Sequence, residues 1–177
     1  MKRVLGSVLI SSDEIQRRTR ELGRQISQDY ADKSVTLVAI LKGSFIFLAD
    51  VIRNINPEIP VEVDFMSVSS YGDSTTSSGT IVIEKDIEVK IEGRHIIIVE
   101  DIVDSGLTLT HVHRILGDKA PLSIRIATLL EKPRNSKYER KLDYVGFQIP
   151  NSFVVGYGLD FAQRYRNLPD IRVLDEV

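Results

Sequence analysis

Cysteine and tryptophan are both absent from this 177-residue chain, and histidine occurs only three times. Without cysteine the chain can form no disulfide, no thiolate nucleophile and no cysteine-ligated zinc or iron–sulfur site. With so few histidines, an all-histidine metal site is not expected either. Any metal that the protein uses should therefore be a hard cation bound through oxygen atoms.

An excess of basic residues is also missing. The chain carries 23 Lys and Arg residues against 25 Asp and Glu residues, for a net charge of −2. Non-specific binding to nucleic acid depends on neutralising many phosphates with basic side chains. Nucleic acid is therefore not an expected partner.

Long apolar runs are missing as well, since no stretch approaches the roughly 18 apolar residues of a membrane span. Residues 4–10 are apolar but are interrupted by Gly6 and Ser7, so we expect no cleaved leader there. Hydrophobic residues make up 42% of the chain and charged residues 27%, as in soluble globular domains. We expect a cytoplasmic protein with no membrane partner and a single domain over residues 1–177.

Apolar periodicity predicts the main elements. Ser11 and Glu14 have the spacing of a capping box, and a helix is predicted over residues 13–30. Further helices should begin near Phe45 and Leu107. Strands are predicted at 35–41, 61–68, 95–100, 124–130, 143–147 and 173–174. Because strands alternate with helices, the pattern predicts an α/β fold with a mostly parallel sheet.

Two predicted loops have distinctive compositions. Residues 69–80 are dominated by Ser, Thr and Gly, and we expect a mobile loop there. Residues 132–141 form a basic loop. The first could be a solvent-excluding lid or simple surface disorder, and composition alone does not separate the two.

Three carboxylates follow the strongest predicted strand, at Glu100, Asp101 and Asp104. They precede Ser105-Gly106-Leu107-Thr108, where two hydroxyls and a glycine at a helix start can hold a phosphate. The carboxylates would repel a bare phosphate but would bind sugar hydroxyls or Mg²⁺. A phosphorylated sugar satisfies both requirements.

A second strand-to-helix turn contains Lys42 and Gly43, where a mobile cation and an accessible backbone could meet another anion. Taken alone, this turn is better explained as an ordinary strand–turn–helix connection, because a single Lys-Gly pair is a weak signal. The Walker pattern GxxxxGK[ST] and the dinucleotide fingerprint GxGxxG are both absent. Two separated anion sites around a hydroxyl site imply a ribose with phosphate groups at both ends.

Residues Val99 to Thr108 resemble the phosphoribosyl-diphosphate signature of type I phosphoribosyltransferases. Further motifs, in the order expected for the bacterial hypoxanthine-guanine branch of that family, are Leu41-Lys42-Gly43, Ser69-Ser70-Tyr71-Gly72, Lys132-Pro133-Arg134, Phe153 to Asp160 and Arg164 to Pro169. The resemblance covers nearly the whole chain. It implies a twisted, mostly parallel sheet flanked by helices, with a small hood and a flexible active-site loop that includes Ser70 and Tyr71.

The resemblance also implies a reaction, in which phosphoribosyl diphosphate and hypoxanthine or guanine give a nucleoside monophosphate and pyrophosphate, with Mg²⁺ as cofactor. Glu100 and Asp101 would hold the ribose hydroxyls and a metal ion. The 5′-phosphate would be bound by the segment from Asp104 through Ser105, Gly106 and Leu107 to Thr108. Leu107 stands where some relatives carry lysine, but its backbone donor remains.

The remaining roles implied by the resemblance concern pyrophosphate and the purine. Lys42, Gly43 and Arg166 would bind pyrophosphate, the peptide before Lys42 would be cis, and Asp160 would bind a second Mg²⁺. Asp104 would face purine N7 as the catalytic base or acid. In purine binding, Lys132 would donate to the 6-oxo group, Phe153 would stack on the base and the backbone of Val154 would contact the edge of the base. Family members form dimers or tetramers, so a homodimer or homotetramer is expected.

Two alternatives stay open. An enzyme of the same fold could act on xanthine, adenine or orotate, although Lys132 favours a 6-oxopurine because it offers a donor and no acceptor. A phosphoribosyl-diphosphate-sensing regulator could instead bind RNA. That function needs a basic surface, which a net charge of −2 does not favour.

Overall fold

The computed structural model describes residues 3–70, 81–133, 138–139 and 141–176. The elements in chain order are β1 (Arg3–Ile10), α1 (Ser12–Asp29), β2 (Val35–Leu41), α2 (Phe45–Ile52), β3 (Val61–Ser70), β4 (Ile81–Lys85), β5 (His95–Val103), α3 (Leu107–Gly117), β6 (Ser123–Glu131), β7 (Tyr144–Gln148), β8 (Val154–Val155) and β9 (Ile171–Glu176). None of the helices in these ranges has the length and apolar character needed to cross a bilayer.

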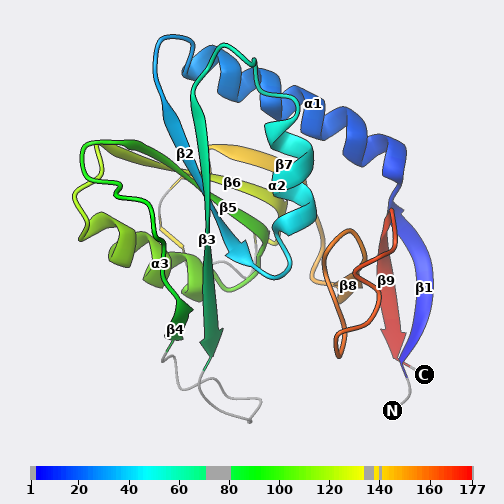
Figure 1. The fold of residues 1–177 in the computed structure, drawn as a ribbon. Coiled ribbons are helices and arrows are strands. Elements are labelled where there is room, and N and C mark those ends of the chain that lie inside the picture. Colours follow the sequence, from blue (N-terminus) through cyan, green and yellow to red (C-terminus); the bar gives the residue numbers. More distant parts are fainter. Residues whose placement is uncertain (1–2, 71–80, 134–137, 140, 177) are drawn as a thin grey trace.

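Six strands form the main sheet in the order β4-β3-β2-β5-β6-β7 (Figure 1). All neighbours in it are parallel except β3 and β4. The predicted mostly parallel α/β sheet is therefore confirmed. The capping box is confirmed too, since Ser11 Oγ accepts from the Glu14 amide and Glu14 Oε2 accepts from the Ser11 amide.

Helices cover both faces of this sheet, α1 and α2 on one and α3 on the other (Figure 1). Successive side chains of a central strand point to opposite faces of the sheet and pack against different helices. Leu37 packs with α1 and α2, whereas its neighbour Val38 packs with α3. Strands buried on both faces need apolar residues at every position. This is why β2 and the first half of β5 read as continuous apolar runs.

The order of the strands creates a crevice between β2 and β5. From β2 the chain passes through α2 outward to β3, whereas from β5 it passes through α3 in the opposite direction to β6. In open α/β sheets such a switch point, at the carboxyl ends of the strands, is where ligands bind. Both turns singled out in the sequence follow these two strands.

A second, antiparallel sheet has the order β1-β9-β8 and lies beside the main one (Figure 1). Of this sheet, the sequence pattern predicted only residues 173–174. The pattern also missed β4, which belongs to the main sheet. Irregular pairing explains the miss of β1, because its register with β9 shifts twice between Leu5 and Ile10. A strand that shifts register does not keep a strict period of two.

Two boundaries also differ from expectation. β3 continues through Ser69 and Ser70, which were assigned to a loop, because both pair with β4. β5 continues past the predicted end at Glu100 to Val103, through a ladder with β6, so Asp101 lies within the strand instead of after it. The rest of the expected lid, including Tyr71, lies outside the described residues, as do residues 134–137 and 140 of the basic loop.

Asp64 stabilises the edge of the main sheet near β4. It is 7% exposed, and its carboxylate accepts hydrogen bonds from the amides of Phe65 (2.7 Å), Glu88 (2.6 Å) and Val89 (2.9 Å). Burial acts to raise the pKa of Asp64, but these hydrogen bonds outweigh it and lower the pKa below its ordinary value. The ionised form therefore stabilises the fold.

Replacing Asp64 with alanine should lower the free energy of unfolding by about 1–3 kcal/mol at pH 7, because three partly buried amides lose their acceptor. Part of the native carboxylate's contribution is electrostatic. This part is fully present above the unfolded pKa of about 3.9 and disappears as pH falls through the lower folded pKa. Urea unfolding at pH 7 and at acidic pH measures both effects. Glu84→Ala, at an exposed residue of β4, is the control, and equal urea midpoints for Asp64→Ala and wild type at pH 7 would contradict this role.

Candidate active site

A cavity of about 290 Å³ opens at the switch point between β2 and β5. Its walls come from the ends of β2, β3 and β5, the first turn of α3 and the loop between β8 and β9. Seven of the residues predicted from the sequence line it: Lys42, Gly43, Glu100, Asp101, Thr108, Asp160 and Arg166. Ser69, the first residue of the predicted lid, lines it too, as do Val68 and Ile81, which had no role assigned from the sequence.

A smaller hollow of about 90 Å³ lies against the first and shares Glu100 and Thr108 with it. It is bordered by the turn from Val103 to Thr108. Gly106 caps α3 with a φ of 76°, a left-handed conformation that glycine adopts without steric cost. The amides of the first helical turn have no partner within the helix, so this hollow can bind an anion.

The two acidic residues at the end of β5 lie in an unusual environment. Glu100 is 7% exposed, and its Oε2 atom is buried without a hydrogen-bond partner among the described residues. Burial, together with the neighbouring Asp101 carboxylate, raises the pKa of Glu100 well above its ordinary value. Burial also raises the pKa of Asp101. A bound cation or hydroxyl donors would stabilise the ionised form of such a pair.

These residues fit Mg²⁺ only in combination with a substrate. The described residues contain no group of three or more His, Cys, Asp or Glu side chains placed to hold an ion. Mg²⁺ is nevertheless commonly bound by one or two carboxylates together with substrate oxygens. The adjacent carboxylates of Glu100 and Asp101, one with a partnerless oxygen, provide such an incomplete set.

The turn after β2 lies directly against these acids. The Leu41–Lys42 peptide bond is cis, as the resemblance implies. A Cβ atom on Gly43 would lie 1.5 Å from Asp101 Oδ2, so only glycine leaves room for that carboxylate. Lys42 is exposed at the cavity rim.

Asp160 and Arg166 face the same cavity from the loop between β8 and β9. Arg166 forms an ion pair with Asp160 at 2.7 Å and donates to the Gly158 carbonyl at 2.7 Å. A Cβ on Gly158 would lie 2.2 Å from the Gly43 carbonyl oxygen, so the two turns touch backbone to backbone. Asp160 thus has a cationic side-chain partner in the cavity wall, and its role as a ligand of a second Mg²⁺ stays a prediction.

Asp104 and Lys132 form a contact that the sequence did not predict. Lys132 Nζ lies 2.8 Å from Asp104 Oδ2, and the Lys132 amide donates to the Val103 carbonyl at 2.9 Å. Lys132 is only 7% exposed, whereas the Asp104 side chain is about half exposed. The buried ammonium of Lys132 therefore holds the half-exposed Asp104 carboxylate in place beside the smaller hollow.

Two of the predicted purine residues, Phe153 and Val154, lie at the start of β8, whereas Lys132 follows β6. Phe153 is 44% exposed and makes an edge contact with Phe161, with ring centroids 5.8 Å apart. Val154 is buried within β8. Phe161 was missed in the sequence, where only its position next to Asp160 could have indicated it. Leu107 is 44% exposed on the first turn of α3.

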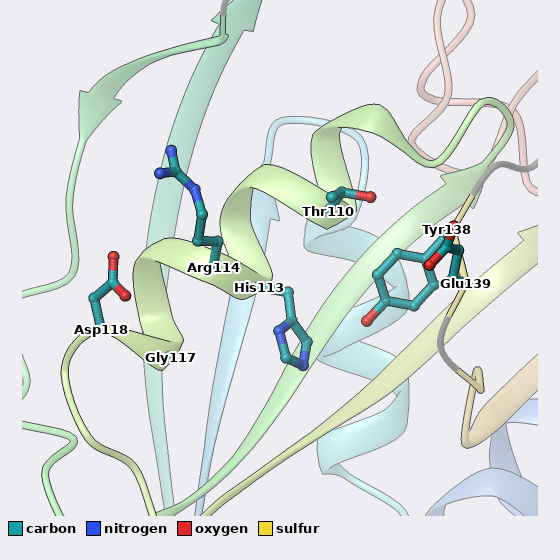
Figure 2. Close-up of a pocket in the computed structure, with 7 residues that line it drawn as sticks. All are labelled: Thr110, His113, Arg114, Gly117, Asp118, Tyr138 and Glu139. Atoms are coloured by element: carbon teal, nitrogen blue, oxygen red, sulfur yellow. The ribbon is translucent and has the colours of Figure 1, made fainter.

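A larger hollow, of about 720 Å³, lies away from these residues along the outer side of α3. Figure 2 shows its wall, with His113 and Tyr138 facing each other across it and Arg114 pointing outward. It contains neither the acidic pair nor the turn of Lys42. We therefore place the chemistry at the switch point and not in this larger hollow.

Known proteins provide an independent comparison. The phosphoribosyl transferase domain family matches residues 11–162. A hypoxanthine-guanine phosphoribosyltransferase of Bacillus subtilis is 49% identical over 174 residues, or 98% of this chain and 96% of that protein. The one from Dictyostelium discoideum is 50% identical over 171 residues, 96% and 95% of the two chains.

Solved structures agree. A hypoxanthine-guanine phosphoribosyltransferase from Bacillus anthracis superposes with a TM-score of 0.90 at 42% identity, covering 99% of this chain and 100% of that one. A hypoxanthine phosphoribosyltransferase from Staphylococcus aureus gives a TM-score of 0.91 at 43% identity, over 97% and 92% of the two chains. These matches confirm the predicted type I phosphoribosyltransferase fold. Together with the site at the switch point, they show that the chain belongs to the phosphoribosyl transferase family, in its hypoxanthine-guanine branch.

Proposed function

We propose that this protein is a purine salvage enzyme that transfers the 5-phosphoribosyl group from phosphoribosyl diphosphate to hypoxanthine or guanine, giving IMP or GMP and pyrophosphate. One observation carries the proposal: an acidic pair, with Glu100 buried and Asp101 partly buried, lies between the hollow at the start of α3 and the cationic turn, all at one switch point. This order matches a ribose with a phosphate at one end and pyrophosphate at the other. The relatives that cover nearly the whole chain are named as enzymes of this kind.

The residues have distinct tasks along the substrate. Glu100 and Asp101 would accept hydrogen bonds from the ribose hydroxyls, and the amides from Ser105 to Thr108 would hold the 5′-phosphate. When bound, Mg²⁺ would neutralise charge on the departing pyrophosphate. Lys42 and Arg166 would bind that leaving group. Loss of pyrophosphate leaves positive charge on the ribose ring, as in glycosidic cleavage generally.

The Asp104–Lys132 ion pair supports the proposed recognition of a 6-oxopurine base. In the nucleotide product, purine N7 and the 6-oxo group are adjacent acceptors on one edge of the base. Lys132 would donate to the oxo group while Asp104 holds or receives the N7 proton, and Phe153 would stack on the ring. Adenine would place its 6-amino group against the Lys132 ammonium. Because both groups are donors, neither would have an acceptor there.

The proposal includes several wider features. We propose one functional domain, supported by a single buried cluster that joins Ile10 and Ile171 of the small sheet to the main core. We also propose a cytoplasmic location and a homodimer or homotetramer. A xanthine-specific enzyme and an RNA-binding regulator are less favoured, because the relatives are named as hypoxanthine or hypoxanthine-guanine enzymes.

A purine panel tests the function directly. With phosphoribosyl diphosphate and Mg²⁺, kcat/KM for hypoxanthine and guanine should exceed that for adenine by about 10⁴-fold or more, since an adenine leaves buried polar groups unpaired. Chelation of Mg²⁺ should abolish turnover. Xanthine and orotate complete the panel. Turnover of adenine with none of hypoxanthine or guanine would overturn the assignment.

A further inference from the structure

Residues 156–168, which make up most of the loop between β8 and β9, have an unfavourable backbone conformation near the candidate site (drawn in orange in Figure 1). Tyr157, Ala162, Gln163 and Tyr165 all have positive φ angles between 49° and 77°. Non-glycine residues adopt this left-handed region at a cost in free energy. Hydrogen bonds within the loop and packing against its neighbours must offset this cost.

Tyr157 provides the side-chain contact from this loop to α2. Its ring is 6% exposed, and its hydroxyl donates a hydrogen bond to Asp50 Oδ2. Its amide donates to the Leu168 carbonyl at 2.8 Å, which ties both ends of the loop to one residue. Asp50 has Arg53 as its other partner, through Oδ1, and Arg53 is largely exposed.

The position of this hydrogen bond links two halves of the cavity. Asp50 lies on the helix that begins directly after the Lys42–Gly43 turn, whereas Tyr157 directly precedes Gly158, which touches Gly43. Gly158 in turn exchanges hydrogen bonds with Arg166, 3.0 Å from its amide and 2.7 Å from its carbonyl. A shift of Tyr157 would therefore move Arg166 relative to Lys42.

We propose that Tyr157 is a positioning residue: its hydrogen bond to Asp50 fixes the spacing between the Lys42–Gly43 turn and the Asp160–Arg166 pair, and so sets the geometry of the pyrophosphate subsite. This inference rests on the proposed function. Tyr157 itself does not line the cavity. It acts through the loop that carries Arg166.

The test compares Tyr157→Phe, which keeps the ring and its packing, with wild type. KM for phosphoribosyl diphosphate should rise about 10-fold, the loss expected for one hydrogen bond to a charged group. KM for hypoxanthine should stay within about twofold, because Lys132, Phe153 and Val154 all lie outside this loop. Amide hydrogen exchange in residues 156–168 should accelerate about 10-fold.

Partner variants separate this role from a general loss of stability. Asp50→Ala should reproduce both effects, and the double variant should add little to either single one, since both remove the same bond. Arg53→Gln removes the other partner of Asp50 and should resemble wild type. Equal substrate KM values and equal exchange rates in Tyr157→Phe and wild type would overturn the inference. If wild type has no transferase activity, the proposed function fails, and the exchange measurement still decides whether Tyr157 holds the loop.

Discussion

Asp104→Asn should lower kcat for hypoxanthine by about 10²–10⁴-fold, the usual contribution of a positioned acid or base. Asparagine keeps the size of the side chain but cannot take or give a proton at purine N7. It also leaves Lys132, which is 7% exposed and 2.8 Å from the native carboxylate, without its anionic partner. Steady-state kinetics in the forward direction measure the loss.

Binding of phosphoribosyl diphosphate should change little in this variant, because Glu100, Asp101 and the α3 amides that would hold the ribose and the 5′-phosphate are untouched. Calorimetric titration of that substrate therefore shows that the variant is folded. Asp118→Asn, at the exposed end of the same helix, is the matched control. Wild-type turnover in Asp104→Asn would remove this residue from the mechanism.

Gly43→Ala should reduce kcat/KM by about 10²-fold or more, because displacement of reacting groups by about 1 Å has effects of this size. The new Cβ would lie 1.5 Å from Asp101 Oδ2 and 2.5 Å from its Cγ, so the carboxylate or the turn must move. Either shift separates the acidic pair from the cationic turn. The kinetics should show a higher KM for phosphoribosyl diphosphate together with a lower kcat.

Gly117→Ala is the matched control for this substitution. Gly117 ends α3, and a Cβ there would meet nothing within 4 Å. Alanine favours a helix over glycine by about 1 kcal/mol in helix interiors, so this variant should be as active and at least as stable as wild type. Normal kinetics in Gly43→Ala would show that Asp101 is not held where the substrate binds.

Local features of this protein were largely readable from the chain. The capping box at Ser11 and Glu14, the strand 35–41 and the helix starts near Phe45 and Leu107 depend on neighbouring residues and on periodicity within one element. The same holds for the acidic and phosphate-binding turn, because its carboxylates, glycine and hydroxyls lie within nine consecutive positions. Residues so close in sequence stay close in any compact fold.

The spatial arrangement of the separate segments was decided only by the tertiary structure. Lys132 meets Asp104 across 28 positions, and Tyr157 meets Asp50 across 107. The small sheet forms because β1 pairs with β9 from the opposite end of the chain, with an irregular register that leaves no clear alternation. Such contacts depend on where strand order places each segment, and hydrophobic periodicity reports only which face of an element is buried. The chain by itself therefore determined the chemistry available at each turn, whereas the sheet topology decided which turns face one cavity.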